Sequence, residues 1–116
     1  MSQDKIVFIT GASQGIGREI AYQFAKEKYS LIITFKQEKK EAEKTAEHCH
    51  KLGSKEALIL QLDITNDASI KKCVKAALSK HPKIDILINN AGVFTYLPLE
   101  KQDFSMIESQ VRTNVE

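Results

Sequence analysis

Short apolar runs alternate with longer amphipathic stretches through most of this chain. The apolar runs are continuous and predict four strands, over residues 5–10, 31–35, 57–62 and 84–88. The stretches after them repeat apolar residues at helical spacing and predict helices over residues 15–28 and 38–52, and a third that Thr65 or Asn66 caps and Pro82 ends. Residues 89–99 are predicted to be irregular, and a last helix to begin near Gln102. The predicted buried positions are Ile16, Ile20 and Phe24 in the first helix and Ala42, Ala46, Cys49 and Leu52 in the second.

Strands that each precede a helix predict an α/β fold, in which a parallel sheet carries helices on both faces. Continuously apolar strands agree with this prediction, because parallel strands are covered on both sides. We expect one domain over residues 1–116, a Rossmann-type doubly wound sheet with strand order 3-2-1-4. In that order the fourth strand is an open apolar edge, which proteins rarely leave bare, so we expect a truncated fold that continues beyond Glu116.

A glycine-rich loop, residues 10–17 with the sequence TGASQGIG, joins the first predicted strand to the first predicted helix. Glycine permits the positive φ of a tight turn and lets backbone amides approach a phosphate without a Cβ in the way. The positive end of the following helix then faces the anion. Glycines also simply make turns, but this place between strand and helix favours nucleotide binding. The predicted cofactor-binding residues of the loop are Gly11, Ala12, Ser13, Gln14, Gly15, Ile16 and Gly17.

Polar residues follow the third and fourth predicted strands. Asp63 ends the third, and ligands of an open α/β sheet bind at such carboxyl ends, where a carboxylate can accept a hydrogen bond from an adenine amino group. On position alone, a helix-initiating aspartate explains Asp63 equally well. The segment Asn-Asn-Ala-Gly, residues 89–92, follows the fourth strand and by itself indicates a turn. Asn114, taken alone, is a solvated residue of the last predicted helix.

These four segments, in this order, resemble the short-chain dehydrogenase/reductase family, and within it 3-oxoacyl-carrier-protein reductase-like members. The family carries a Thr-Gly-x-x-x-Gly-Ile-Gly loop, an Asp-Val or Asp-Ile pair, an Asn-Asn-Ala-Gly segment and a helix-borne catalytic asparagine. The resemblance implies that Asp63 and Ile64 bind the cofactor, with Asp63 at the adenine. It also implies that Asn90, Ala91 and Gly92 lie at the cofactor and that Asn89 braces the sheet. Asn114 is, by the same resemblance, a catalytic residue.

The resemblance implies an oxidoreductase that transfers a hydride between a nicotinamide and a small-molecule carbonyl or secondary alcohol, with a homo-oligomeric full-length form. The family's catalytic serine and Tyr-x-x-x-Lys pair lie downstream of the asparagine. Tyr22 and Lys26 have that spacing, but they belong to the first helix, far from the nicotinamide, and are interpreted as helix surface. We therefore expect the 116 residues alone to be an inactive fragment. A non-catalytic NADP(H)-binding module and a non-functional remnant are the alternatives, and the substrate stays open.

The end of the second predicted strand bears on the choice of cofactor. An acidic side chain there accepts from the ribose of NAD, whereas a basic one nearby accommodates the 2′-phosphate of NADP. Phe35 stands where NAD-preferring relatives carry aspartate, and Lys36 beside it can pair with a phosphate. Gln14 stands where many NADP-preferring relatives carry a basic residue, and it brings no charge. We predict NADP(H) rather than NAD(H), with Lys36 at the 2′-phosphate; an ordinary surface lysine is the alternative.

Composition narrows the remaining classes. The net charge of +2 is too small to favour nucleic acid, and no apolar stretch is long enough for a membrane helix. Two cysteines without framework spacing, and no signal peptide, favour the cytoplasm. The segment His48-Cys49-His50 has the composition of a metal cluster. Residues two apart on a helix point to nearly opposite sides, however, so we expect no metal site.

Overall fold

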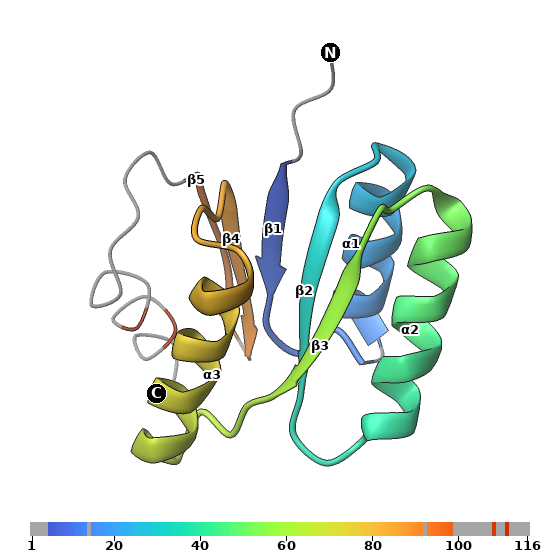
Figure 1. Cartoon of the computed structure of the whole chain (residues 1–116). Coiled ribbons are helices and arrows are strands. Elements are labelled where there is room, and N and C mark those ends of the chain that lie inside the picture. Colours follow the sequence, from blue (N-terminus) through green and yellow to red (C-terminus); the bar gives the residue numbers. More distant parts are fainter. Residues whose placement is uncertain (1–4, 14, 92, 99–107, 109–110, 112–116) are drawn as a thin grey trace.

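The chain folds into one five-stranded sheet with helices on both faces (Figure 1). The computed structural model describes residues 5–13, 15–91, 93–98, 108 and 111. Its elements are β1 (Ile6–Ile9), α1 (Gly15–Lys26), β2 (Ser30–Phe35), α2 (Lys39–Leu52), β3 (Ala57–Gln61), α3 (Asp67–Lys80), β4 (Ile86–Ala91) and β5 (Val93–Pro98).

The strand order is β3-β2-β1-β4-β5, and the strands from β3 to β4 run parallel. The predicted order 3-2-1-4 is therefore confirmed. The prediction that residues 89–99 are irregular is wrong, because β4 extends to Ala91 and β5 pairs antiparallel with it, from Ala91 opposite Val93 to Ile86 opposite Pro98. The sequence Val-Phe-Thr-Tyr at positions 93–96 is rich in strand-forming residues. The expectation of an open edge at the fourth strand is wrong as well, since β5 pairs along that edge.

Successive residues of the central strands pack against opposite faces of the sheet. On one face, Val7 and Ile9 of β1 lie in a core with residues of α1 and α2; on the other, Ile6 and Phe8 lie in a core with residues of α3. Both faces are thus covered, as the continuously apolar strands predicted. This arrangement leaves the carboxyl ends of β1, β2 and β3 at one edge of the sheet, next to the start of α1 (Figure 1).

The buried side of α1 differs from the predicted one. Small residues contact the sheet at a spacing of four, namely Gly17, Ala21 and Ala25, whereas Ile16 is 72% exposed. Small side chains let the helix axis approach the strands closely, so the stripe of small residues faces inward. Ile20 and Phe24 are only partly buried at the border of the core, and the prediction of a buried Ile16 is wrong.

The buried side of α2 also departs from the prediction at one position. Ala42 and Cys49 are buried as predicted, and Ala46 and Leu52 are partly buried. Thr45 is fully buried as well, which the apolar pattern did not indicate. A threonine is tolerated there because its hydroxyl makes hydrogen bonds inside the protein.

The ends of the helices follow local chemistry. Asn66 caps α3, since its side chain accepts a hydrogen bond from the backbone N–H of Ser69 at 2.9 Å, which settles the choice between Thr65 and Asn66. α1 ends at Lys26, two residues before the predicted end, and Lys28 then takes a φ of 68°. Gly53 follows α2 with a φ of 132°. The last predicted helix lies mostly outside the described residues, of which Glu108 and Val111 are helical.

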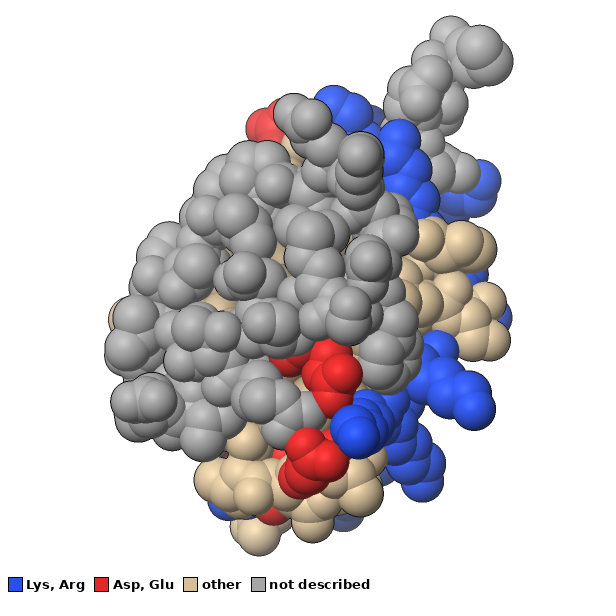
Figure 2. Space-filling view, turned by 90° about the vertical axis from the view of Figure 1, so that its left-hand side faces the viewer, with Lys and Arg blue, Asp and Glu red and all other residues tan. Residues whose placement is uncertain are grey.

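Charges of both signs lie on the described surface. Figure 2 shows basic and acidic side chains on the face that is at the left of Figure 1. On α3, the ammonium of Lys71 lies 3.5 Å from the carboxylate of Asp67, one turn away. This mixed pattern fits the small net charge of the sequence. None of the helices in the described part of the chain is long and apolar enough to cross a membrane.

Candidate functional site

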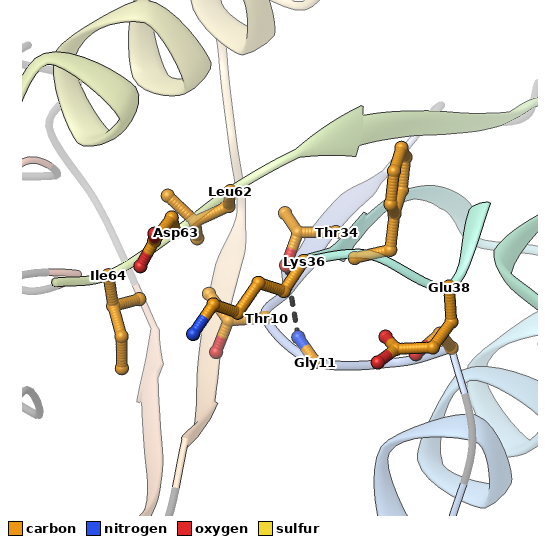
Figure 3. A pocket seen from close by; sticks show the side chains of 10 residues that line it. Thr10, Gly11, Thr34, Lys36, Glu38, Leu62, Asp63 and Ile64 are labelled. Carbon is orange, nitrogen blue, oxygen red and sulfur yellow. Dashed lines mark hydrogen bonds between the residues drawn. The ribbon is translucent and has the colours of Figure 1, made fainter. Parts of the chain in front are cut away.

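A cavity of about 210 Å³ opens at the carboxyl ends of β1, β2 and β3 (Figure 3). The three strands end side by side there because they are parallel neighbours in the sheet. Segments far apart in the sequence thus contribute to one site, as expected for ligands of an open α/β sheet. The lining residues are Thr10, Gly11, Ser13, Thr34, Phe35, Lys36, Glu38, Leu62, Asp63 and Ile64.

Thr10, Gly11 and Ser13 of the glycine-rich loop line this cavity, and the loop leads into α1. Gly11 and Gly15 both take a φ of 68°, a conformation that disfavours side chains. A Cβ added at Gly15 would meet no atom within 4 Å, so the space in front of the helix start is open. Gly17 is buried against the sheet and allows close packing of α1. The loop therefore presents the open N-terminus of a helix, which suits a phosphate.

The second strand delivers Phe35 and Lys36 to the same cavity. Phe35 is buried, whereas Lys36 is exposed and its chain extends over the cavity (Figure 3). Glu38, just before α2, also lines the site, although its side chain makes no capping bond. Sequence reasoning missed Glu38, and its position two residues after Lys36 was the available signal. Among the described lining residues, Lys36 is thus the one basic side chain beside two carboxylates, Asp63 and Glu38.

Asp63 lies opposite Lys36, at the end of β3 (Figure 3). Its Oδ1 accepts hydrogen bonds from the hydroxyl of Thr65 at 2.6 Å and from the backbone N–H of Thr65 at 3.0 Å. These bonds, the hydroxyl foremost, lower the pKa of Asp63, and the Lys36 charge lowers it further. The carboxylate is therefore an ionised hydrogen-bond acceptor at the cavity wall, while the cap of α3 is supplied by Asn66.

The end of β4 is tied to the start of the glycine-rich loop. The hydroxyl of Thr10 donates to the side-chain oxygen of Asn89 at 3.0 Å, and both residues are buried. The structure describes the backbone of Asn90 and Ala91 as part of β4. Contacts of their side chains with a cofactor stay a prediction. The other predicted site residues, Gln14, Gly92 and Asn114, lie outside the described residues.

The remaining candidate residues lie away from the cavity lining. Tyr22 packs edge-on against the ring of His48 at 4.6 Å between α1 and α2, and Lys26 is exposed at the far end of α1. Cys49 is fully buried, and burial raises the pKa of its thiol to about 12. Within the described residues, no group of histidine, cysteine or acidic side chains could hold a metal ion. Ile16 is exposed at the start of α1, and its predicted role at the cofactor stays a prediction.

Known proteins resemble this chain over most of its length. The profile of the short-chain dehydrogenases matches residues 5–116. The mouse dehydrogenase/reductase SDR family member 7 is 40% identical over 92 residues, which cover 77% of this chain and 27% of the mouse protein. Five curated relatives, the mouse protein among them, are matched over 25% to 33% of their own length.

Solved structures share the fold. A short-chain dehydrogenase/reductase variant of Serratia marcescens superimposes with a TM-score of 0.73 and 30% identity, over 97% of this chain and 46% of that one. An NADH-dependent reductase in complex with NAD gives a TM-score of 0.71 and 26% identity, over 78% of this chain and 37% of that one. Together with the sequence profile, these similarities show that the chain belongs to the short-chain dehydrogenases, a family of oxidoreductases.

Proposed function

We propose that this chain binds NADP(H) at the edge formed by the glycine-rich loop, Lys36 and Asp63, as the cofactor-binding part of an oxidoreductase. The reaction would move a hydride between the nicotinamide and a carbonyl or secondary alcohol of a small molecule. The observation that carries the proposal is the cavity in which these three features meet. Membership of an oxidoreductase family that uses nicotinamide cofactors supports it, as does the NAD complex of a structural neighbour.

Different residues of the site would bind different parts of the nucleotide. The loop and the N-terminus of α1 would hold the pyrophosphate, because Gly15 leaves open space and backbone N–H groups there. Asp63 would accept a hydrogen bond from the adenine amino group, since its lowered pKa keeps it ionised at neutral pH. Lys36 would pair with the 2′-phosphate.

The case for NADP(H) over NAD(H) rests on the side chains at the end of β2. The side chain of Phe35 cannot accept a hydrogen bond from a ribose hydroxyl, and Phe35 is a buried residue of the cavity lining. Lys36 supplies one positive charge to the cavity lining, and Glu38 and Asp63 supply two carboxylates to the same lining. A ligand with a 2′-phosphate gains from Lys36 what an unphosphorylated ribose does not.

The chemistry itself belongs to the cofactor, which supplies or accepts the hydride when bound. This chain's own part is to bind and orient the nucleotide along the sheet edge. We extend the proposal to Asn114 as a catalytic residue, to a homo-oligomeric assembly and to a cytoplasmic location, in line with the family resemblance.

A pair of glycine variants tests nucleotide binding directly. In Gly15→Ala, the new methyl group meets open space but the positive φ is strained, and the loop must shift where the phosphate would bind. In Gly53→Ala the φ is strained too and the Cβ would lie 3.3 Å from the Ala25 carbonyl oxygen, yet Gly53 follows α2, remote from the cavity. NADPH fluorescence titrations should show weaker binding by Gly15→Ala and unchanged affinity in folded Gly53→Ala. No binding by the unchanged chain, or equal loss in both variants, would overturn the proposal.

A further inference from the structure

Two buried hydroxyl groups contact the backbone of the glycine-rich loop from separate elements. Thr34 belongs to β2 and Thr45 to α2, and their side chains are 2% and 0% exposed. Each forms a hydrogen bond with a main-chain atom of the loop, one with a donor and the other with an acceptor. A buried hydroxyl is costly unless it is hydrogen-bonded, and the contacts with the loop help to meet this need in both threonines.

Thr34 holds the first glycine of the loop. The backbone N–H of Gly11 donates to Oγ1 of Thr34 at 3.0 Å (Figure 3). The N–H of Ala12 donates to the Thr34 carbonyl at 3.3 Å. Gly11 has a positive φ of 68°, so the chain turns sharply at the residue that Thr34 holds. The contact joins residues 23 positions apart and ties the turn of the loop to the end of β2.

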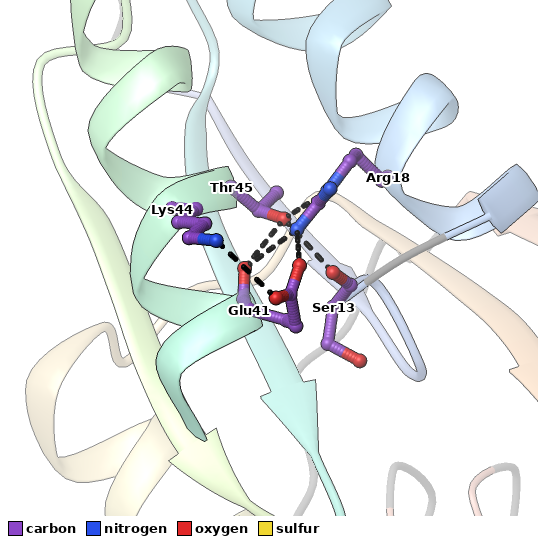
Figure 4. Close-up of polar contacts among 5 residues, drawn as sticks. All are labelled: Ser13, Arg18, Glu41, Lys44 and Thr45. Carbon is purple, nitrogen blue, oxygen red and sulfur yellow. Dashed lines mark hydrogen bonds and ion pairs between the residues drawn. The ribbon is translucent and has the colours of Figure 1, made fainter. Parts of the chain in front are cut away.

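Thr45 holds the loop two residues further on. Its Oγ1 lies 3.3 Å from the carbonyl oxygen of Ser13 and 3.1 Å from that of Glu41 (Figure 4). A hydroxyl has a single hydrogen to donate. The Glu41 carbonyl also accepts from Nη2 of Arg18 at 2.8 Å, so the one hydrogen of Thr45 lies between two carbonyl oxygens, those of Ser13 and Glu41.

Arg18 completes this arrangement from α1. Its Nε donates to Oγ1 of Thr45 at 2.7 Å, so the hydroxyl oxygen is the acceptor and its own hydrogen points elsewhere. Nη2 also pairs with the Glu41 carboxylate at 3.0 Å, which lowers the pKa of that carboxyl and keeps it charged. The guanidinium therefore holds the Thr45 hydroxyl oxygen as an acceptor, which leaves its hydrogen to the carbonyl oxygens of Ser13 and Glu41 (Figure 4).

We propose that Thr34 and Thr45, the latter oriented by Arg18, are positioning residues that hold the glycine-rich loop in its phosphate-binding geometry before the nucleotide arrives. The inference rests on the proposed nucleotide site. A loop that is already ordered loses less conformational entropy when it binds, so affinity for the pyrophosphate part of the ligand is higher. The adenosine part would contact the side chains of Lys36 and Asp63 instead of the glycine-rich loop.

Valine and serine substitutions separate the hydroxyl from the shape of the side chain. Thr34→Val and Thr45→Val keep the volume but leave Gly11 N–H or Ser13 C=O without its side-chain partner. Calorimetric titrations would use NADPH, which carries the pyrophosphate, and adenosine 2′-monophosphate, which does not. We expect each valine variant to bind NADPH about tenfold more weakly and the monophosphate with unchanged affinity. Thr34→Ser and Thr45→Ser should restore NADPH binding.

Ser54→Ala is the matched control for loss of a buried hydroxyl. Ser54 is 2% exposed and its hydroxyl donates to the Tyr29 carbonyl at 2.7 Å, away from the cavity lining. It should lower the free energy of unfolding and leave NADPH affinity unchanged. If a valine variant does not fold by circular dichroism, Arg18→Met provides a second test. It removes the Nε donor to Thr45 from a partly exposed position and should weaken the binding of NADPH but not of the monophosphate.

Three results would overturn the inference. The first is NADPH affinity that is unchanged in both valine variants and in Arg18→Met. The second is an equal loss of affinity for NADPH and for the monophosphate, which would show general loosening. The third is failure of the serine variants to restore binding. If the unchanged chain binds neither ligand, the proposed function itself is wrong and the inference falls with it.

Discussion

Replacing Lys36 by glutamine removes the one basic side chain among the described residues of the cavity lining. Glutamine keeps a similar length and polarity but has no charge. On the proposed function, the change removes a charge-assisted contact with the 2′-phosphate and leaves the rest of the nucleotide untouched. The carboxylate of Asp63 should stay ionised, because the hydroxyl of Thr65 is the first cause of its lowered pKa.

The exposure of Lys36 sets the size of the effect. Two unit charges about 4 Å apart attract by about 1 kcal/mol in water and about 4 kcal/mol near a protein surface, before the cost of desolvation. Exposed ion pairs retain about 0.2–1 kcal/mol, and hydrogen bonds to charged groups about 1.5–3 kcal/mol. For the exposed Lys36 and a doubly charged phosphate we take about 1–2 kcal/mol, which corresponds to about 5- to 30-fold in affinity.

The assay is a pair of fluorescence titrations, with NADPH and with NADH, at an ionic strength near 0.15 M, where the Debye length is about 8 Å. Lys36→Gln should lower the affinity for NADPH by about 5- to 30-fold and leave the affinity for NADH unchanged. Lys26→Gln is the matched control, since Lys26 is also exposed but lies at the far end of α1 from the glycine-rich loop. An unchanged ratio of NADPH to NADH affinity in Lys36→Gln, or the same change in Lys26→Gln, would refute the role of Lys36.

Two further predictions concern the scaffold of the site. Because Arg18 lowers the pKa of Glu41 below its ordinary value of 4.5, the stabilisation is fully present above that value and is lost as the pH falls through the lowered pKa. The urea midpoint of Glu41→Gln should therefore fall below that of the unchanged chain at about pH 7, and the gap should close as the pH falls through the lowered pKa of Glu41; a gap independent of pH would contradict this. Burial raises the pKa of both Cys49 and Cys73 to about 12, so neither thiol should react with a thiol reagent at neutral pH until urea unfolds the chain. Rapid labelling of either cysteine in the folded protein would show that its helix does not pack as described.

The core of the fold was predictable because its signal is local. Four apolar runs and the amphipathic stretches between them lead directly to a parallel sheet in the order observed. The strand β5 was missed because the Asn-Asn-Ala-Gly segment before it indicates a turn, and the short run after it was taken as part of the same irregular stretch. Its pairing with β4 is a contact between strands, which a search for single apolar runs does not test.

The buried face of α1 was misplaced for a different reason. Apolar periodicity ranks isoleucine above glycine and alanine, so Ile16 was expected inside. Close helix–sheet packing favours small residues instead, and Gly17, Ala21 and Ala25 provide them. The exposed Ile16 lies at the start of α1, beside the loop.

The site residues also differ in whether a local sequence pattern marks them. Residues that sit in motifs, such as Gly11 and Asp63, were expected at the site from their positions at strand ends, and both line the cavity. Thr34 and Thr45 were not identified, because their hydroxyls reach the loop over 23 and 32 positions of sequence. Such contacts depend on how β2 and α2 pack against the loop, and no local pattern encodes them.

The central claim is that a nucleotide binds at the carboxyl ends of β1, β2 and β3. An NMR titration of the ¹⁵N-labelled chain with NADPH tests it most directly, since each backbone amide reports its own surroundings. We predict that the largest shifts fall on the amides of Gly11, Ser13, Lys36 and Asp63, while the amide of Gly53, at the other end of α2, does not shift. Shifts centred on Gly53, or no shifts at millimolar NADPH, would contradict it.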